Sequence, residues 1–145
     1  MYLISDIDSS PRAERLLALR EVGCDVPHIV KNLMGMAIAY SHRLATFDIS
    51  NPAKPKAIAT LQMDSTFYPH WISGDPGSDR IVMTDQGDGT SRVMVGMLDG
   101  ATGQIRWDER FRDKGSSKPG VNLENVSWPN GIKGKVMAHG SLFIQ

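Results

Sequence analysis

Three histidines recur in a pattern that could bind a transition metal. His28 and His70 each follow a proline, in "VPHIV" and "YPHWI", and lie forty-two residues apart, while His139 follows later in "MAHGSLF". Imidazole nitrogen suits copper, zinc and iron, and three imidazoles with an open position make a usable metal site. If the fold brings these side chains to one rim, we expect a metal site at His28, His70 and His139.

The repeated Pro-His pair also has a structural interpretation. Proline fixes the backbone where a strand begins, and the imidazole can hydrogen-bond to neighbouring backbone. The sequence names no carboxylate that would orient these imidazoles around an ion. Cys24, four residues before His28, is either a further soft ligand or a lone buried cysteine. Both interpretations stay open at this point.

The elements that must position the histidines follow from an internal repeat. Residues 6–28 align without a gap with residues 48–70, from Asp6 over Asp48 to His28 over His70. Each period then holds four short β-rich runs separated by turn sequences. We expect strands from His28 and over 34–40, 43–49 and 56–63, and then from His70 and over 80–85, 91–99 and 103–111. Four strands in a period of about 40 to 50 residues are typical of a β-propeller blade.

One stretch, residues 9–23, favours a helix when taken alone. Pro11 follows a serine, apolar residues recur at helical spacing, and Gly23 would end the helix. Its partner in the repeat carries Pro52 and Pro55 and the β-rich run "AIATL". Because local propensity is a weak guide, we expect a strand here as well.

We therefore predict an all-β chain that forms a single partial β-propeller domain over residues 1–145. It would hold about three four-stranded blades, two complete and two partial. Its parts are the outer strands of one blade (1–27), two blades (28–63 and 70–111), an insertion loop (112–138) and the first strand of the next blade (139–145). A ring closes only with about four to eight blades. We therefore expect the remaining blades, or partner chains, to cover the open edges.

Two families of propellers resemble this chain. The segment "LATFDISNPAKPKAIATL" (44–61) resembles the repeat of the LVIVD and YVTN groups. The combination of "GCDVPHIV", "YPHWI", the long segment over residues 79–111 and "MAHGSLF" is similar, more weakly, to the selenium-binding protein family, whose members include methanethiol oxidases. That resemblance implies a seven-bladed propeller with copper bound by channel histidines, to which His28, His70 and His139 would correspond. It also implies copper-dependent oxidation of a small thiol.

Composition excludes several classes of function. The chain has 145 residues, 41% of them hydrophobic and 22% charged, which is typical of globular proteins. Lys plus Arg equals Asp plus Glu at 16 each, so no field draws the chain to nucleic acid. The longest apolar run, near residues 33–40, is too short for a membrane span. A single cysteine excludes an internal disulfide, and nothing in the sequence indicates a compartment.

The expected function is binding of a metal or a small ligand at the channel rim. The alternative is a non-catalytic propeller that acts as a scaffold for protein partners. The sequence contains no complete catalytic signature, so it leaves open whether the protein is an enzyme.

Overall fold

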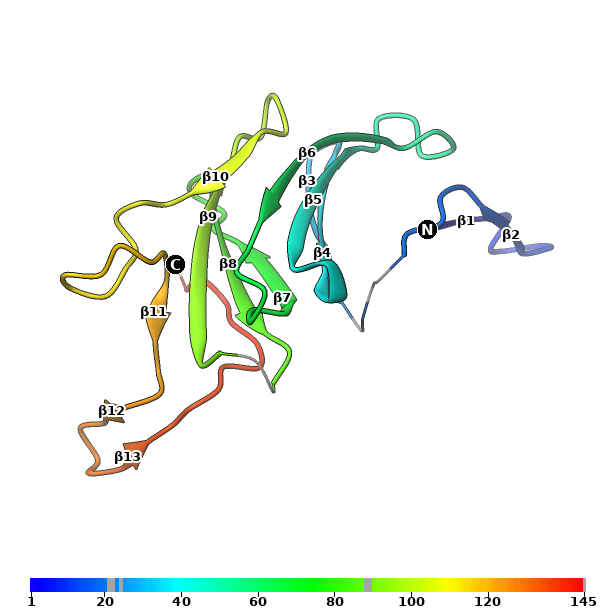
Figure 1. Cartoon of the computed structure of the whole chain (residues 1–145). Coiled ribbons are helices and arrows are strands. Elements are labelled where there is room, and N and C mark those ends of the chain that lie inside the picture. Colours follow the sequence, from blue (N-terminus) through cyan, green and yellow to red (C-terminus); the bar gives the residue numbers. More distant parts are fainter. Residues whose placement is uncertain (21–22, 24, 88–89, 145) are drawn as a thin grey trace.

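The computed structural model describes residues 1–20, 23, 25–87 and 90–144, and it shows an all-β chain (Figure 1). Several antiparallel sheets follow one another along the chain, and none of those in the described ranges closes on itself. The predicted all-β class is therefore confirmed. Within the same ranges, no helix is long and apolar enough to cross a membrane.

The first sheet is a four-stranded meander that begins at one of the expected histidines. Its strands, in spatial and sequence order, are β3 (His28–Val30), β4 (Leu33–Ile38), β5 (Arg43–Asp48) and β6 (Lys56–Gln62). A single 3-10 turn over Ala39–Ser41 and a left-handed His42 (φ 51°) connect β4 to β5. The expected strands over 34–40, 43–49 and 56–63 are confirmed to within two residues at each end.

The second sheet repeats this meander. Its strands are β7 (Pro69–Gly74), β8 (Arg80–Asp85), β9 (Arg92–Leu98) and β10 (Ile105–Trp107). The strand expected over 103–111 is shorter than predicted, because the chain leaves β9 after Trp107. Another strand, β11 (Val121–Asn122), returns to pair with the first residues of β9. The turn expected at Asp88 and Gly89 lies outside the described residues.

The chain before the first sheet forms a separate two-stranded hairpin. β1 (Tyr2–Ser5) pairs antiparallel with β2 (Arg12–Arg15), and the described residues between 9 and 20 contain no helix. The expected strand is thus confirmed over 12–15, although it stops sooner than the aligned β6. Beyond it, Met1, Leu17 and Leu19 pack on the face of the first sheet that carries Ile38 and Phe47.

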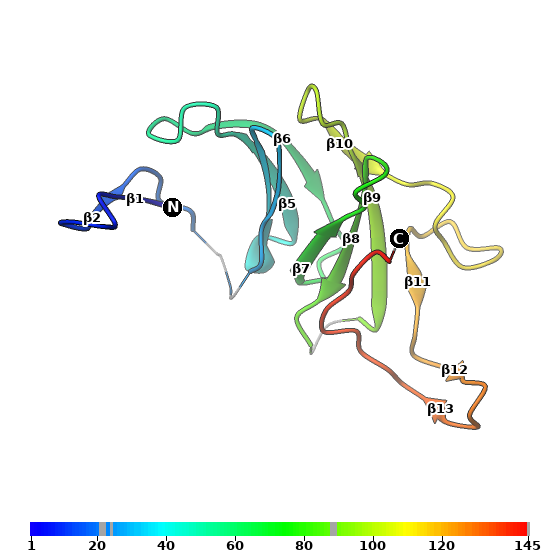
Figure 2. The same cartoon turned by 180° about the vertical axis from the view of Figure 1, so that it is seen from behind.

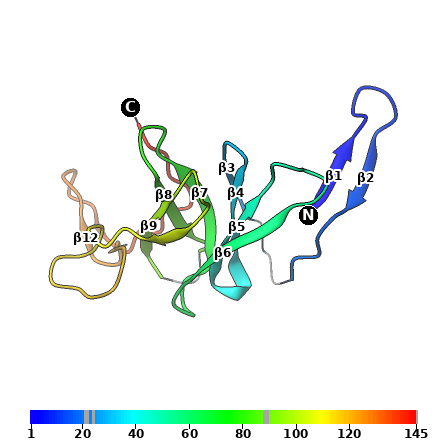
Figure 3. The same ribbon diagram turned by 90° about the horizontal axis from the view of Figure 1, so that it is seen from above.

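The main core lies between the two sheets, which stand side by side in Figures 2 and 3. It contains buried side chains from both sheets and from the segment that connects them: Ala37, Leu44, Met63, Phe67, Ile72, Ile81, Met83, Met94 and Leu98. One buried hydrogen bond also joins the sheets, from Thr46 Oγ1 on β5 to the carbonyl oxygen of Gly103 (2.7 Å). Burial of these apolar side chains, together with this hydrogen bond, holds the two meanders together.

The C-terminal part differs from the expected loop and strand. The expected insertion loop contains β11 and a small exposed hairpin of β12 (Val126–Ser127) and β13 (Lys133–Gly134). The strand expected over 139–145 is absent from the described residues 139–144. Side chains hold this segment instead, because Trp71 Nε1 and Ser73 Oγ both donate to the carbonyl of Ser141 (3.0 and 2.7 Å). Donors from side chains do not build a regular backbone ladder.

Candidate functional site

Two of the three expected histidines lie together. The rings of His70 and His139 have their centroids 4.9 Å apart and are tilted by 46°. His70 is only 6% exposed, and its Nδ1 is buried without a hydrogen-bond partner among the described residues. His139 is exposed, and its backbone is anchored where Thr84 Oγ1 donates to its carbonyl oxygen (2.8 Å). We call these two side chains the imidazole pair.

Three chain segments meet at the imidazole pair. His70 lies on β7, and the backbone N–H of Val26 donates to the His70 carbonyl (2.9 Å), next to a parallel bridge between Val26 and Trp71. The segment that leads into β3 therefore runs beside β7. The C-terminal segment adds His139 and reaches the same strand through Ser141. The imidazole pair thus depends on contacts between residues far apart in the sequence.

A partly buried carboxyl group lies next to this junction. Burial raises the pKa of Asp25, while hydrogen bonds from backbone N–H groups and the charge of His70 oppose the rise. Gly23 N donates to Asp25 Oδ2 (2.8 Å), whereas Asp25 Oδ1 and Gln86 Oε1 are buried without a partner among the described residues. A β-carbon on Gly23 would lie 3.2 Å from Asp25 Oδ1 and 2.8 Å from Gln86 Oε1. Both unpartnered oxygens therefore lie against the same glycine.

The structure does not bring His28 to the imidazole pair. Its ring lies directly against Gly74, where a β-carbon would collide with the imidazole. Gly74 is four residues beyond His70 on β7, roughly 13 Å along an extended strand. Burial lowers the pKa of His28, which favours the neutral imidazole. In this position His28 packs between the inner strands of the two sheets.

The remaining histidine, His42, has a structural role. Its Nδ1 lies 3.0 Å from the carbonyl oxygen of Phe67, and its ring packs against Tyr68 with centroids 4.5 Å apart. These contacts tie the β4–β5 turn to the segment that leads into β7.

Two imidazoles suit copper or zinc, but a metal centre needs more ligands. The described part of the chain contains no group of three or more histidine, cysteine, aspartate or glutamate side chains that could hold an ion. Cys24, which the sequence leaves open as a soft ligand or a lone buried cysteine, lies outside the described residues. The described residues therefore do not by themselves assemble the copper centre that the family resemblance implies.

Sequence reasoning missed Asp25 and Gln86. The repeat does carry a signal for the first, because Asp25 aligns with Phe67, so a charged residue replaces a buried aromatic one. Nothing in the sequence singles out Gln86, because its role comes from its position after β8. Comparisons with family models, curated proteins and solved structures find no match to this chain. The resemblance to propeller families therefore stays a prediction.

Proposed function

We propose that this chain is part of a β-propeller that binds a transition metal or a small polar ligand at the imidazole pair. Two successive four-stranded meanders packed side by side support the propeller, because this is how neighbouring blades are arranged. Strands β3 and β7, the first of each meander, are neighbours and would line the channel. The remaining blades would come from a longer chain or from partner chains.

The observation that carries the proposed binding role is the unpartnered nitrogen of His70, which lies beside a second imidazole. A buried polar atom without a hydrogen bond costs about 1–3 kcal/mol, and a bound ion or ligand is one way to recover that cost. His139 places a second imidazole 4.9 Å away, between centroids, and Asp25 is close enough for its charge to interact with that of His70. A bound ion or polar ligand would satisfy these groups together.

Copper and thiol oxidation rest on the family resemblance alone. Copper, when bound, would supply redox chemistry with dioxygen. In this chain His70 and His139 would hold the ion, and the further ligand would come from Cys24 or from another blade. Asp25 would hydrogen-bond and balance charge at the same junction.

Metal binding can be tested with four versions of the full-length protein: the wild type and the variants His28→Ala, His70→Ala and His139→Ala. Each is dialysed against Cu²⁺ or Zn²⁺ and analysed for bound metal, while ¹⁵N NMR of the imidazoles reports any polar ligand. We expect about one ion per chain, or a ligand-dependent shift at His70. His28→Ala is the matched control, because it removes an identical side chain from the aligned position of the repeat.

The outcomes separate the hypotheses. Binding that is lost in His70→Ala and His139→Ala but kept in His28→Ala supports the imidazole pair. Binding lost in all three variants supports the three-histidine site expected from the sequence. If the folded wild type binds no metal and its His70 resonances respond to no ligand, the binding proposal is wrong and the Pro-His repeat is structural.

A non-catalytic scaffold is the second candidate function, and the β12–β13 hairpin favours it. The hairpin projects away from the sheets (Figure 1), and Trp128 and Ile132 are 40% and 60% exposed there. Aromatic side chains often anchor protein interfaces. Loss of a captured protein partner on Trp128→Ala, with metal content unchanged, would support this role.

A further inference from the structure

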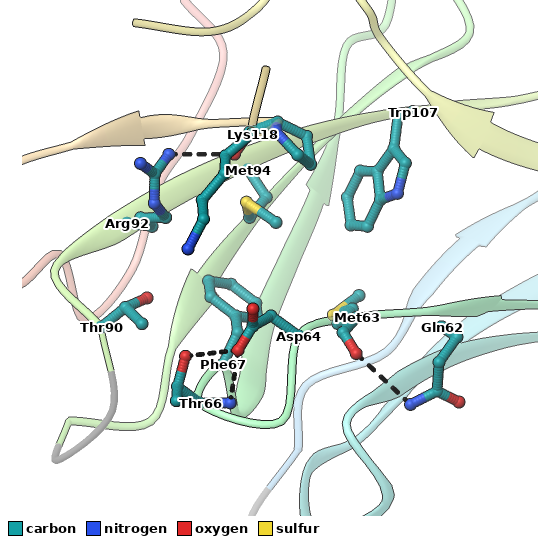
Figure 4. Close-up of a pocket in the computed structure, with 11 residues that line it drawn as sticks. Gln62, Met63, Asp64, Thr66, Phe67, Thr90, Arg92, Met94, Trp107 and Lys118 are labelled. Atoms are coloured by element: carbon teal, nitrogen blue, oxygen red, sulfur yellow. Dashed lines mark hydrogen bonds between the residues drawn. The ribbon is translucent and has the colours of Figure 1, made fainter. Parts of the chain in front are cut away.

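A cleft lies at the border between the two sheets, between the end of β6 and the strands β9 and β10 (Figure 4). Its volume is about 300 Å³, at the lower limit for sites that take small molecules. Neither member of the imidazole pair lines it. The cleft is therefore a second place where a ligand could bind.

The interior of the cleft is apolar. Phe67, Met94 and Met63 are 1%, 3% and 6% exposed, so they form a fixed floor that also belongs to the main core. Trp107, the last residue of β10, is only partly buried and packs against this core. Figure 4 shows Met94 between Trp107 on one side and Lys118 on the other. An apolar side chain about the size of an aromatic ring would gain from burial here.

Within the part of the chain that the structure describes, the mouth carries one cation without an ion pair, Lys118, and one carboxylate, Asp64. The Lys118 ammonium has no hydrogen bond or ion pair with any residue in the described ranges, and it reaches over the cleft. Arg92, in contrast, is already occupied, because it donates to the carbonyls of Pro119 and Gly120 (3.0 and 2.8 Å) and pairs with Asp113 (3.3 Å). Of these two basic side chains, only Lys118 remains to receive an anionic group.

Asp64 supplies the opposite charge. Hydrogen bonds from Thr66 keep its pKa below the usual value, and the charge of Lys118 contributes in the same direction. Asp64 is therefore ionised at neutral pH. Thr66 N and Oγ1 donate to a single oxygen, Asp64 Oδ1 (2.9 and 2.6 Å), and Asp64 Oδ2 makes no hydrogen bond within the described ranges. That oxygen can accept from a ligand.

We propose that this cleft binds a free α-amino acid with a large apolar side chain. The ligand's carboxylate would pair with Lys118, its ammonium with Asp64, and its side chain would lie between Trp107 and the methionines. A simple anion fits less well, because Asp64 would repel it, and a simple cation would be repelled by Lys118. A zwitterion carries both charges one carbon apart and matches the balanced mouth of the cleft.

Calorimetric titration of the full-length protein with L-phenylalanine tests the proposal. Three analogues each lack one recognised group: 3-phenylpropionate lacks the ammonium, phenethylamine lacks the carboxylate, and glycine lacks the apolar side chain. We expect L-phenylalanine to bind and each analogue to bind at least about tenfold more weakly, the typical effect of losing a charge-assisted hydrogen bond or a buried ring.

Matched variants test each charge. Lys118→Met should weaken binding about tenfold, whereas Lys114→Met, in the same loop and also exposed, should change it less than about twofold. Asp64→Asn should weaken binding by a similar factor. Its control is Asp75→Asn, because Asp75 organises an equivalent turn through Gly77 N and Ser78 Oγ (2.9 and 2.7 Å) away from the cleft.

The proposal is wrong if L-phenylalanine produces no heat at millimolar concentration, or if 3-phenylpropionate binds as tightly as the amino acid. It is also wrong if Lys118→Met binds L-phenylalanine as the wild type does. This last variant changes an exposed side chain, so it keeps the test valid even if Asp64→Asn disturbs its turn. None of these results depends on the imidazole pair, so the proposed function is tested separately.

Discussion

Replacing Thr46 by valine should weaken the association of the two sheets. Thr46 lies on β5 in the first sheet, is fully buried, and donates from Oγ1 to the carbonyl oxygen of Gly103 in the β9–β10 turn of the second sheet (2.7 Å). Valine has nearly the same shape but no donor. The change therefore removes this hydrogen bond and leaves the core packing almost unaltered.

The expected loss of folding free energy comes from the Gly103 carbonyl oxygen, which keeps no donor when Thr46 is replaced. The Gly103 carbonyl is buried, and a buried acceptor that loses its donor costs about 1–3 kcal/mol. For a chain of this length, such a loss lowers the melting temperature by on the order of 5 °C. Most of the effect should appear as a lower urea midpoint with an unchanged slope, because the surface exposed on unfolding stays the same.

Urea unfolding followed by tryptophan fluorescence measures this cost. Thr46→Ser is the matched control, because serine keeps the hydroxyl and loses only a methyl group, which should cost about 1 kcal/mol or less. The reasoning is refuted if the valine variant is as stable as the wild type, or if serine destabilises the protein more than valine does. Either result would mean that the hydroxyl does not connect the sheets in solution.

Two aspartates should respond to pH in opposite ways. Hydrogen bonds from Arg110, and the charges of Arg110 and Arg80, hold the pKa of the buried Asp108 (3% exposed) below its usual value; Arg80 Nε lies 3.0 Å from Oδ2. Its carboxylate therefore stabilises the fold above about pH 4, and this stabilisation disappears as the pH falls through the lowered pKa. Asp108→Asn should cost about 1–2 kcal/mol at neutral pH and progressively less as the pH falls below about 4, and an equal loss at neutral and at acid pH in urea unfolding would contradict this. Burial raises the pKa of Asp25 in the folded state, so its ionisation opposes folding as the pH rises above the ordinary aspartate range. Asp25→Asn should gain stability relative to the wild type between about pH 4 and 7, and a variant that loses stability over that range would show that the carboxylate has a partner.

The order of the strands was predictable because each is a local pattern. The segments that begin at Arg43 and at Arg80 are rich in β-branched and apolar residues, and turn residues flank each of them. The strands predicted there therefore match β5 and β8 closely. The repeat also decided correctly against a helix over 12–15, where the local pattern favoured the wrong structure. The ends of strands were less predictable. β10 ends just before Asp108, whose buried carboxylate forms ion pairs with Arg80 and Arg110, and the sequence pattern does not indicate these contacts.

The candidate site was predictable only in part. The repeat indicated that His70 was important, and the structure places it at a junction of inner strands beside His139. Alignment alone put His28 in an equivalent place, yet its ring lies against Gly74. The reason is the parallel register between these segments: Val26 lies beside Trp71, so His28 falls further along β7 and meets Gly74.

The sequence by itself determined the all-β class, the four strands in each period and the balanced charge of the chain. These depend on side-chain alternation, turn residues and composition, which act over a few neighbouring positions. Only the tertiary structure decided that His70 meets His139, that Gln86 faces Gly23, and that Asp64 and Lys118 share one cleft. Such contacts join residues tens of positions apart, and they depend on how the sheets pack and on where each loop returns, which no local pattern specifies.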